Sequence, residues 1–364
     1  MSSSIGKQLK ISLFGESHGP AIGVVIDGLP AGIRLEQEKI LNDMARRRAS
    51  GQAGATQRRE ADVPKVLSGL YKSRTTGTPL MAYIANSTQH SSDYAKLAGI
   101  PRPSHADYTS IVKYAGQQDL RGGGHFSGRL TAPLVFAGAV ARAYLEQRCG
   151  AVCASHLAQI GSVKDDRFDP LHVNKEQLVS LYNSPFPVLN EQKGAEMQQL
   201  MEEARMSQDS LGGMAECAIV GLPVGIGDPM FDGLESKIAA ALFGVPAVKA
   251  VEFGDGVDFA GARGSQVNDG MHMQGGRPAL LSNHCGGILG GISSGAPLIV
   301  RTTFKPTPSI SLPQQTVDMA KRKDTELVIE GRHDSCLTVR GMAAAEAAIL
   351  IAVADAMLCE VNKK

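Results

Sequence analysis

The chain has 364 residues, a length that allows one large domain or two ordinary ones. Its formal net charge of +1 argues against a general nucleic-acid-binding protein, which needs a broad basic face. Hydrophobic residues make up 43% of the sequence, but aromatic residues only 5%, so aliphatic side chains must build the core. The six cysteines form no CxxC pair and no apolar leader begins the chain, which predicts reduced thiols in a cytoplasmic protein.

Apolar periodicity predicts strands near residues 8–14, 21–27, 79–84, 151–160, 214–220, 248–253, 297–303 and 335–339. It predicts helices over residues 35–49, 130–148, 191–206, 232–243 and 342–359. Helix 191–206 is polar, and we expect it on the surface. Asp232 and Glu235 resemble a capping box, and Gly244 can end that helix. The last helix is apolar on nearly all sides and contains Glu346 and Asp355, so we expect a core helix rather than a membrane span.

Two stretches of the chain resemble each other, VVIDGLPAGI at 24–33 and CAIVGLPVGI at 217–226. Both predict a strand, a Gly-Leu-Pro turn and then a helix, and each is later followed by a glycine-rich loop and a long apolar helix. The match favours an ancient duplication, and the alternative is a common turn reached twice. No polar or Pro/Ser-rich linker separates the halves, so we expect a single domain over residues 1–364.

Five of the nine histidines lie in segments rich in Gly, Ser or Pro, namely His18, His105, His125, His284 and His333. A single histidine is more often structural than catalytic, but five in irregular polar segments favour a functional site. The metal-binding spacings HxxxH, HxH and HExxH do not occur, so the sequence predicts no metal site.

Arginines and glycines accompany these histidines. The arginines are Arg46, Arg47, Arg48, Arg58, Arg59, Arg102, Arg121, Arg129 and Arg332. A solvated helix end explains one or two of these arginines. A guanidinium group can bind a phosphate or a carboxylate through two parallel hydrogen bonds. The arginines together therefore favour a small ligand with several negative charges. The glycine-rich segments 121–129 and 283–295, with FKPTPS at 304–309, match neither a P-loop nor a Rossmann fingerprint. They favour a flat or phosphorylated cofactor held outside the usual nucleotide folds.

Six motifs occur in the order and spacing of chorismate synthases: FGESHG, RPSHADYTSIVKY, RGGGHFSGR, NHCGGILGGISSG, KPTPS and GRHDSC. The chain resembles that family from about residue 5 to residue 357. The resemblance implies an α+β fold, a β-α-β sandwich with a central layer of long helices between antiparallel sheets, combined here with the internal pseudo-duplication. It also implies a homotetramer.

The resemblance implies that the chain converts 5-enolpyruvylshikimate 3-phosphate to chorismate and phosphate, the last step of the shikimate pathway. This anti-1,4-elimination needs reduced FMN, although it has no net redox change. The substrate's carboxylates and phosphate would explain the arginines, proton transfer would explain the histidines, and the flavin would explain the glycines. NADPH enters only as a possible reductant of the flavin. No nucleic-acid or membrane partner is expected.

By motif, the resemblance assigns His18 to the leaving phosphate, His105 to the N1–C2 edge of the flavin and Asp334 to its N5 edge. Ser17 would support Asp334 or flavin N5, and Arg47, Arg48 and Arg129 would bind substrate or NADP. The predicted FMN contacts are His125, Phe126, Ser127, Pro246, Ala247, Gly290, Lys305, Pro306, Thr307, Pro308, Ser309 and Arg332. Asp334 has an alternative role as a turn residue, and Glu16 one as a structural partner for an arginine or a backbone donor.

The chain departs from the family pattern at three places. His125 and Phe126 stand where many members have Arg-Ser, Leu130 stands in place of a glutamate, and Ala53 in place of an arginine associated with the nicotinamide. The imidazole of His125 carries cofactor charge, or it points away and only its backbone meets the cofactor. Two other functions remain open. One is a flavin-dependent oxidoreductase using a nicotinamide donor, and the other is a non-catalytic protein that binds anions or RNA.

Overall fold

Two antiparallel five-stranded sheets form the β structure of the computed structural model, which describes residues 3–48, 62–86, 99–119, 121–329 and 334–361. The first sheet has the order β1 (Ser4–Ile5), β2 (Lys10–Gly15), β3 (Ala21–Asp27), β7 (Leu80–Ala85) and β4 (Lys65–Ser68). The second has the order β11 (Val248–Phe253), β16 (Leu298–Phe304), β10 (Gly213–Val220), β8 (Val152–Ile160) and β9 (Val163–Lys164). The remaining strands form hairpins: β5 (Leu70–Tyr71) with β6 (Arg74–Thr75), β12 (Met271–Gln274) with β13 (Arg277–Leu280), β14 (Ile288–Leu289) with β15 (Ile292–Ser293), and β17 (Gln314–Asp318) with β18 (Lys323–Leu327).

The described helices fall into a central group and a peripheral group. The central helices are α1 (Gln37–Arg48), α4 (Thr131–Cys149), α7 (Leu234–Phe243) and α9 (Thr338–Val361). The peripheral helices are α3 (Asp107–Lys113), α5 (Lys175–Asn183), α6 (Glu191–Met206) and α8 (Gly264–Val267). Of the peripheral helices, α5 packs on β8, and α6 packs on β8 and β9.

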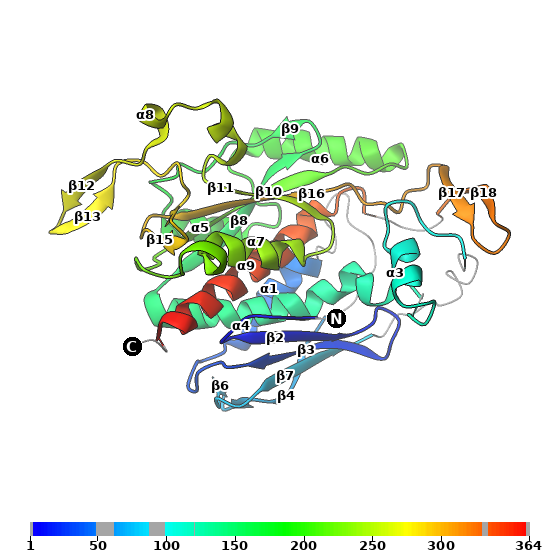
Figure 1. Cartoon of the computed structure of the whole chain (residues 1–364), viewed down its shortest axis with the longest axis horizontal. Coiled ribbons are helices and arrows are strands. Elements are labelled where there is room, and N and C mark those ends of the chain that lie inside the picture. Colours follow the sequence, from blue (N-terminus) through cyan, green and yellow to red (C-terminus); the bar gives the residue numbers. More distant parts are fainter. Residues whose placement is uncertain (1–2, 49–61, 87–98, 120, 330–333, 362–364) are drawn as a thin grey trace.

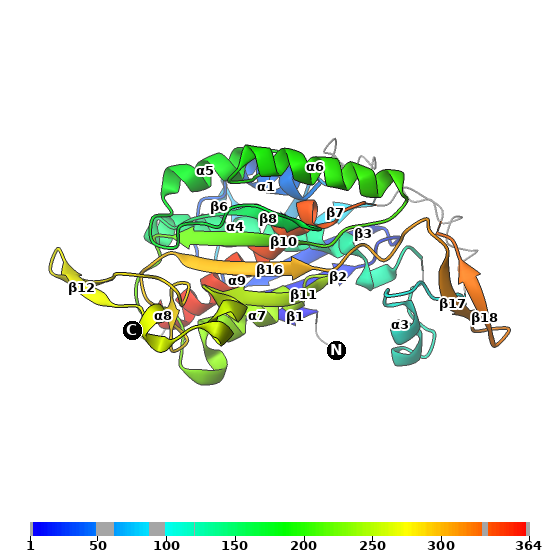
Figure 2. The same cartoon turned by 90° about the horizontal axis from the view of Figure 1, so that it is seen from above.

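Helices α4 and α9 lie between the two sheets (Figure 1). Helix α4 packs on strands β2, β3 and β7, and α9 packs on β8, β10 and β16. Both helices are apolar nearly all round, which is expected of helices buried on every side. Gly138 lets them approach closely, because a Cβ built there would lie 2.3 Å from the Cβ of Ala347. Seen from above, α5 and α6 run along one long side of the molecule (Figure 2).

A buried ionic network crosses this helix layer at Glu346. Its carboxylate binds Arg46 of α1, with oxygen–nitrogen distances of 2.6 and 3.0 Å, and also binds Arg142 of α4. Ser155 of β8 donates a hydrogen bond of 2.8 Å to the same carboxylate. Burial raises the pKa of Glu346, but the two arginines outweigh it and lower the pKa to about 2. The network therefore joins α1, α4, α9 and the second sheet.

The sequence predicted the longer strands of both five-stranded sheets and five of the described helices, but it missed α3, α5 and the short hairpins and was wrong in two places. The strand predicted at 335–339 does not form: Cys336 makes an isolated bridge to Leu211, and α9 begins at Thr338. The capping box is also wrong, because Asp232 lies in a 3-10 turn and binds Lys7, while Gly233 caps α7. Gly244 is the C-cap residue of α7, as predicted, and it ends the helix with a right-handed φ of −73°. Helix α6 has the predicted bounds, although it buries Met197 and Met201.

Two expectations about buried groups concern the cysteines and the last helix. All six cysteines are free thiols. Residues Thr338–Glu360 form a stretch long and apolar enough to cross a membrane, but 94% of its most apolar 18-residue window is buried inside the protein. Such burial is what the core helix of a folded protein shows.

Asp355 of α9 attaches the N-terminal segment to the helix layer. Its Oδ1 accepts hydrogen bonds from the backbone N–H groups of Lys7, Gln8 and Leu9 at 2.8, 2.7 and 2.9 Å. Its Oδ2 lies 2.9 Å from Nζ of Lys237 in α7. Burial raises the pKa of Asp355, but Lys237 and the backbone donors outweigh it and hold this pKa below its ordinary value.

We predict that Asp355→Ala lowers the free energy of unfolding by about 3–5 kcal/mol, because it leaves Lys237 buried without its counter-charge. The folded-state pKa of Asp355 is depressed, so its contribution is present above the unfolded-state pKa of about 3.9 and is lost as pH falls through the folded-state pKa. Urea unfolding of both proteins at equal protomer concentration should therefore show a large difference at neutral pH and a smaller one in acid. Asp232→Ala removes the exposed partner of Lys7 and is the control; an equal loss there would contradict the prediction.

Candidate active site

The turn between β2 and β3 carries Ser17 and His18 at one end of the first sheet. His18 is buried, with 6% of its surface exposed. The hydroxyl of Ser17 lies 3.2 Å from Nδ1 of His18 and 3.3 Å from the carbonyl oxygen of Arg121. The backbone N–H of Ser17 donates to the carbonyl of Gly124 at 3.2 Å. These bonds join the turn to the glycine-rich loop that precedes α4.

That loop packs its backbone directly against two histidine rings. A Cβ built on Gly122 would lie 2.0 Å from Cε1 and 2.1 Å from Nδ1 of His18. A Cβ on the next residue, Gly123, would lie 3.2 Å from Cε1 and 3.4 Å from Nε2 of His105. Both glycines have positive φ, 64° and 107°. Adjacent residues of one loop therefore contact His18 and His105, and the first of them leaves no room for a side chain.

His105 lies in a tight ionic cluster with Arg102 and Asp107. Its Nδ1 is 2.6 Å from Oδ1 of Asp107 and 3.1 Å from Nη2 of Arg102. Arg102 also binds Asp107 through Nε and Nη2, at 2.7 and 2.8 Å. Burial raises the pKa of Asp107, but the hydrogen bonds from Arg102 and His105 outweigh it and hold this pKa well below its usual range. Asp107 is thus an ionised hydrogen-bond acceptor.

The segment that follows β16 lies against the same cluster. Lys305 donates from Nζ to the carbonyl of Ser104, the residue before His105. The backbone N–H of Lys305 donates to the carbonyl of Ala247 at 3.0 Å, which places the Pro246–Ala247 turn beside it. Ala247 has a left-handed φ of 71°, uncommon for a residue with a side chain. Burial, and then Lys249, lowers the pKa of Lys305.

Residues 306–309 and Asp334 come together around Ser210 and Leu211. Ser210 donates to the carbonyl of Thr307 at 2.7 Å, and Leu211 donates to the carbonyl of Ser335 at 2.7 Å. Asp334 is buried and forms an ion pair with Arg340. The buried hydroxyls of Thr307 and Ser335 have no hydrogen-bond partner within the described part of the chain. These two hydroxyls can bond to a cofactor with polar edges, as the predicted flavin has.

Two of the predicted anion-binding arginines share one buried carboxylate. Asp62 binds Arg47 through Oδ2 at 2.7 Å and binds Arg129 through Oδ1. Arg47 also donates to the hydroxyl of Thr131 at 2.9 Å. Asn86 accepts from Arg129 at 3.1 Å and donates to the carbonyls of residues 16 and 19, so it connects this pair to the His18 turn. Arg48 follows Arg47 at the end of α1 and is half-buried.

Some predicted site residues are not brought to this cluster. Gly290 lies in the β14–β15 turn at the opposite end of β16 from Lys305, and β16 alone spans about 20 Å. The ring nitrogens of His125 are engaged by the carbonyl of Gly15 at 2.9 Å and the hydroxyl of Ser3 at 2.8 Å. This geometry favours the alternative in which only the backbone of His125 meets the cofactor. Arg332 and Ala53 lie outside the described residues.

Phe126 and Ser127 remain next to the glycine-rich loop. The ring of Phe126 is partly exposed and packs edge-on against Tyr114, with ring centroids 6.1 Å apart. The hydroxyl of Ser127 accepts from the backbone N–H of Arg129 at 3.2 Å. Glu16 lies beside another carboxylate, Asp119. Burial, and then the negative charge of Asp119, raises the pKa of Glu16.

Sequence reasoning missed three polar residues of the site: Asp62, Asn86 and Asp107. Only Asp107 had a usable signal, the His-x-Asp spacing in RPSHAD, which places a carboxylate near the histidine ring. Asp62 and Asn86 belong to no recognisable motif, and only the folded chain brings them to the arginines.

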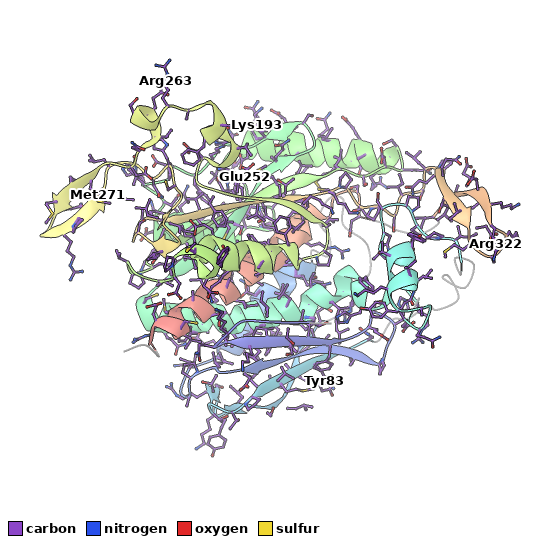
Figure 3. All side chains as sticks on the ribbon, viewed as in Figure 1. Tyr83, Lys193, Glu252, Arg263, Met271 and Arg322 are labelled. Atoms are coloured by element: carbon purple, nitrogen blue, oxygen red, sulfur yellow. The ribbon has the colours of Figure 1, made fainter. Side chains whose placement is uncertain are left out.

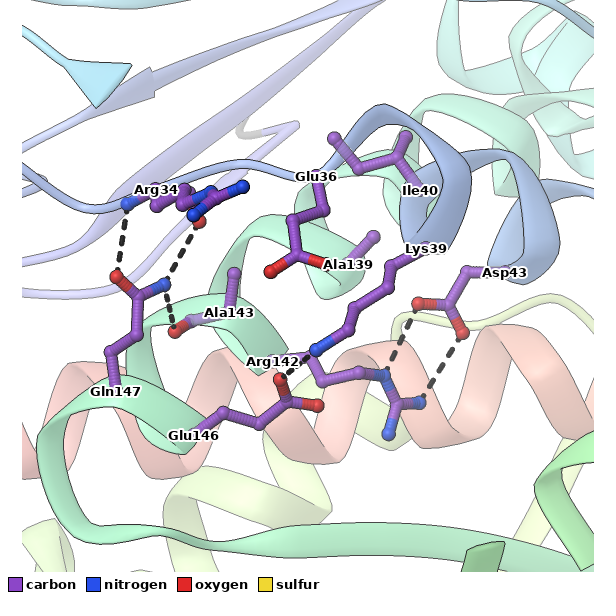
Figure 4. A pocket seen from close by; sticks show the side chains of 10 residues that line it. All are labelled: Arg34, Glu36, Lys39, Ile40, Asp43, Ala139, Arg142, Ala143, Glu146 and Gln147. Carbon is purple, nitrogen blue, oxygen red and sulfur yellow. Dashed lines mark hydrogen bonds and ion pairs between the residues drawn. The ribbon is translucent and has the colours of Figure 1, made fainter. Parts of the chain in front are cut away.

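A hollow between α1 and α4 lies elsewhere (Figure 4). Its lining residues are Arg34, Glu36, Lys39, Ile40, Asp43, Ala139, Arg142, Ala143, Glu146 and Gln147. Lys39 binds Glu146 at 2.9 Å, Arg142 binds Asp43 at 3.2 Å, and the charges are balanced. It flanks the first half of α1 and the last half of α4, away from the histidines. It offers no surplus positive charge to an anionic ligand.

The site thus combines two histidines that contact adjacent glycines with arginines that share a buried carboxylate, the groups that acid–base chemistry on an anionic substrate needs. The family model described as chorismate synthase matches residues 9–358. The chain is 44% identical over 353 residues to a chorismate synthase of Thermococcus kodakarensis, covering 97% of each chain. It is 43% identical over 358 residues to one of Dehalococcoides mccartyi, covering 98% of this chain and 97% of that one.

The fold agrees with these matches. A solved structure titled "Crystal Structure of Chorismate Synthase" superposes with a TM-score of 0.76 at 26% identity, over 98% of this chain and 93% of that chain. The chain belongs to the chorismate synthase family, and the resemblance seen in its motifs is confirmed. It is a lyase of the shikimate pathway, in a family that requires a reduced flavin in general.

We predict that Gly122→Ala lowers turnover on the order of 100-fold or more, because the new methyl group would displace the His18 ring. Gly116→Ala is the matched control: its φ of 75° is also left-handed, but open space surrounds the position. Both changes carry a similar backbone strain of roughly 1–2 kcal/mol, and Gly122→Ala adds the cost of moving the His18 ring, so urea unfolding should show the larger loss of stability there. Phosphate release is the readout. An equal fall in turnover in both variants would mean that backbone strain, not contact with His18, is responsible.

Proposed function

We propose that this chain catalyses the anti-1,4-elimination of phosphate from 5-enolpyruvylshikimate 3-phosphate to give chorismate, with reduced FMN as the flavin. The observation that carries the proposal is the glycine-rich loop, whose consecutive residues Gly122 and Gly123 contact His18 and His105. A leaving phosphate and a departing C6 proton need acid–base groups, and contact of this loop with two histidines supports that role.

His18 would donate a proton or a hydrogen bond to the leaving phosphate. Ser17 supports it, because the hydroxyl lies 3.2 Å from Nδ1 and fixes the plane of the ring. Arg47, Arg48 and Arg129 would bind the substrate's anionic groups. Asp62 holds Arg47 and Arg129 in place before substrate arrives. The N-terminal ends of α4 and α9 face the same region and add partial positive charge.

The flavin site would lie between the glycine-rich loop and the segment after β16. Residues His125 to Ser127 would meet it by their backbone and the Phe126 ring, and the other contacts would come from Pro246, Ala247, Arg332 and residues Lys305 to Ser309. Thr307 and Ser335 offer buried hydroxyls for its polar edge. Reduced flavin supplies an electron-rich ring that accepts the C6 proton with no net redox change. Asp334 would assist at N5, and NADPH would serve only as a reductant of the flavin.

We further propose that the chain acts in the cytoplasm as a homotetramer. Apolar side chains are exposed around the β12–β13 hairpin and the turn before α7, including Met230, Phe231, Val257, Met271, Met273 and Leu281. The hairpin extends from the body and begins at Met271, while Arg322 marks the opposite end of the molecule (Figure 3). An isolated two-stranded hairpin is only marginally stable, and an exposed apolar patch of this kind is typical of a subunit interface.

We infer that residues 1–364 form one domain of sandwich type that arose by duplication. Strands β3 and β10 are each the middle strand of a five-stranded sheet. The turns that follow them have matching glycine conformations, with φ of 85° at both Gly28 and Gly221, and 91° and 99° at Gly32 and Gly225. A single hydrophobic core includes residues of both sheets, which supports one folding unit.

The test of function is anaerobic incubation with the substrate and reduced FMN, following phosphate release and chorismate absorbance. We expect His18→Ala to lower turnover by on the order of 10²–10⁴ while FMN binding stays nearly intact. His172→Ala changes an exposed histidine and should leave turnover near that of the wild type. Near-normal turnover in His18→Ala would overturn the leaving-group role. Stoichiometric oxidation of a nicotinamide would instead favour a flavin-dependent oxidoreductase.

Light scattering coupled to size-exclusion chromatography tests the assembly. The wild type should elute with the mass of four chains, and the double variant Phe231→Glu, Met273→Glu should give smaller species, because charges replace apolar contacts. The control is Tyr71→Glu, which changes an aromatic ring that is 67% exposed on the β5–β6 hairpin. A monomeric wild type, or a double variant of unchanged mass, would contradict the proposed assembly.

A further inference from the structure

The proton arrangement on His105 follows from its neighbours. Arg102 can only donate hydrogen bonds, so its 3.1 Å approach to Nδ1 would need a bare nitrogen there. Asp107 lies closer, at 2.6 Å, and its carboxylate can only accept. Nδ1 cannot satisfy both groups at once. A bare Nδ1 facing an ionised carboxylate at this distance would be repelled, whereas an N–H there forms a short charge-assisted bond.

Arg102 fixes the carboxylate in the orientation that this bond needs. Its Nε and Nη2 bind the two oxygens of Asp107 at 2.7 and 2.8 Å, and its backbone N–H donates to Oδ2 at 3.0 Å. The side chain of Arg102 is 8% exposed, and those of His105 and Asp107 are each 17% exposed. A rigid, partly buried carboxylate therefore faces one nitrogen of the ring.

The other ring nitrogen faces the glycine-rich loop. Nε2 has no hydrogen-bond partner within the described part of the chain, and a Cβ on Gly123 would lie 3.4 Å from it. A further charged group nearby is Lys305, which binds the carbonyl of Ser104. Nε2 is thus the ring atom left available to a ligand beside that loop.

We propose that Asp107, held by Arg102, is a positioning residue that keeps the proton of neutral His105 on Nδ1 and presents Nε2 to the bound flavin. The charged imidazole loses its second proton from Nε2 and regains it there, while the N–H at Nδ1 stays bonded to Asp107. A carboxylate that fixes the tautomer of a catalytic histidine works by the same principle in hydrolytic triads. The role of Nε2 toward the flavin rests on the proposed function, but the tautomer does not.

The first test is ¹⁵N magic-angle-spinning NMR of the full-length protein labelled at histidine. Spectra at about pH 9, where an ordinary imidazole is neutral, are compared with those of His105→Gln to isolate the His105 signals. We expect a protonated Nδ1 and a bare Nε2. A bare Nδ1 with a protonated Nε2 would overturn the proposal. This result needs neither substrate nor flavin, so it does not depend on whether the proposed reaction is correct.

The second test is Asp107→Asn. An amide can offer its N–H₂ group to Nδ1 and so move the ring proton to Nε2, the wrong tautomer for proton transfer there. We expect kcat to fall on the order of 10²–10⁴ while KM for the substrate changes little, together with the tautomer switch in the NMR spectrum. Asp169→Asn is the control, because Asp169 also accepts from a histidine Nδ1, at 2.9 Å, but on the exposed surface. Unchanged kcat in Asp107→Asn would overturn the proposal, and if that variant fails to fold, the wild-type tautomer still decides.

Discussion

The close contact between α4 and α9 is the constraint on which the rest of the molecule depends. Gly138 and Ala347 bring the two helices together, and the Glu346 network fixes α1 and the second sheet against them. The two helices run side by side in the same direction, so both N-termini emerge at one end, where α1 finishes with its arginines (Figure 1). The segments that carry His18 and His105, and the glycine-rich loop that leads into α4, lie at that end.

This arrangement gives the site its electrostatic character. Two helix N-termini and the arginines that end α1 converge, while Asp62, Asp107 and Asp334 are each paired with at least one arginine. The carboxylates orient cations without leaving an unpaired negative charge. A ligand with several negative charges is therefore favoured at this end, whereas the hollow of Figure 4 has balanced charges and offers no such preference.

The sequence predicted the long helices, the central strands and the histidine, arginine and glycine motifs, because each is a local pattern. It failed where a distant contact decided the outcome. Residues 335–339 look like a strand, but Thr338 starts α9, whose apolar face must reach the core. Asp232 looks like a helix cap, but Lys7, which is 225 residues away, binds it. Asp62 had no signal at all, since its role exists only where Arg47 and Arg129 meet. Gly290 belongs to a motif of the family, yet it lies at the far end of β16 in the single chain.

The central claim is that His18 and His105 face one ligand pocket beside the glycine-rich loop. A crystal structure of the enzyme with oxidised FMN and 5-enolpyruvylshikimate 3-phosphate tests it most directly. The account predicts the flavin ring within hydrogen-bond distance of Nε2 of His105, and the substrate phosphate within hydrogen-bond distance of His18. Density for the two ligands elsewhere, for example in the hollow between α1 and α4, would contradict it.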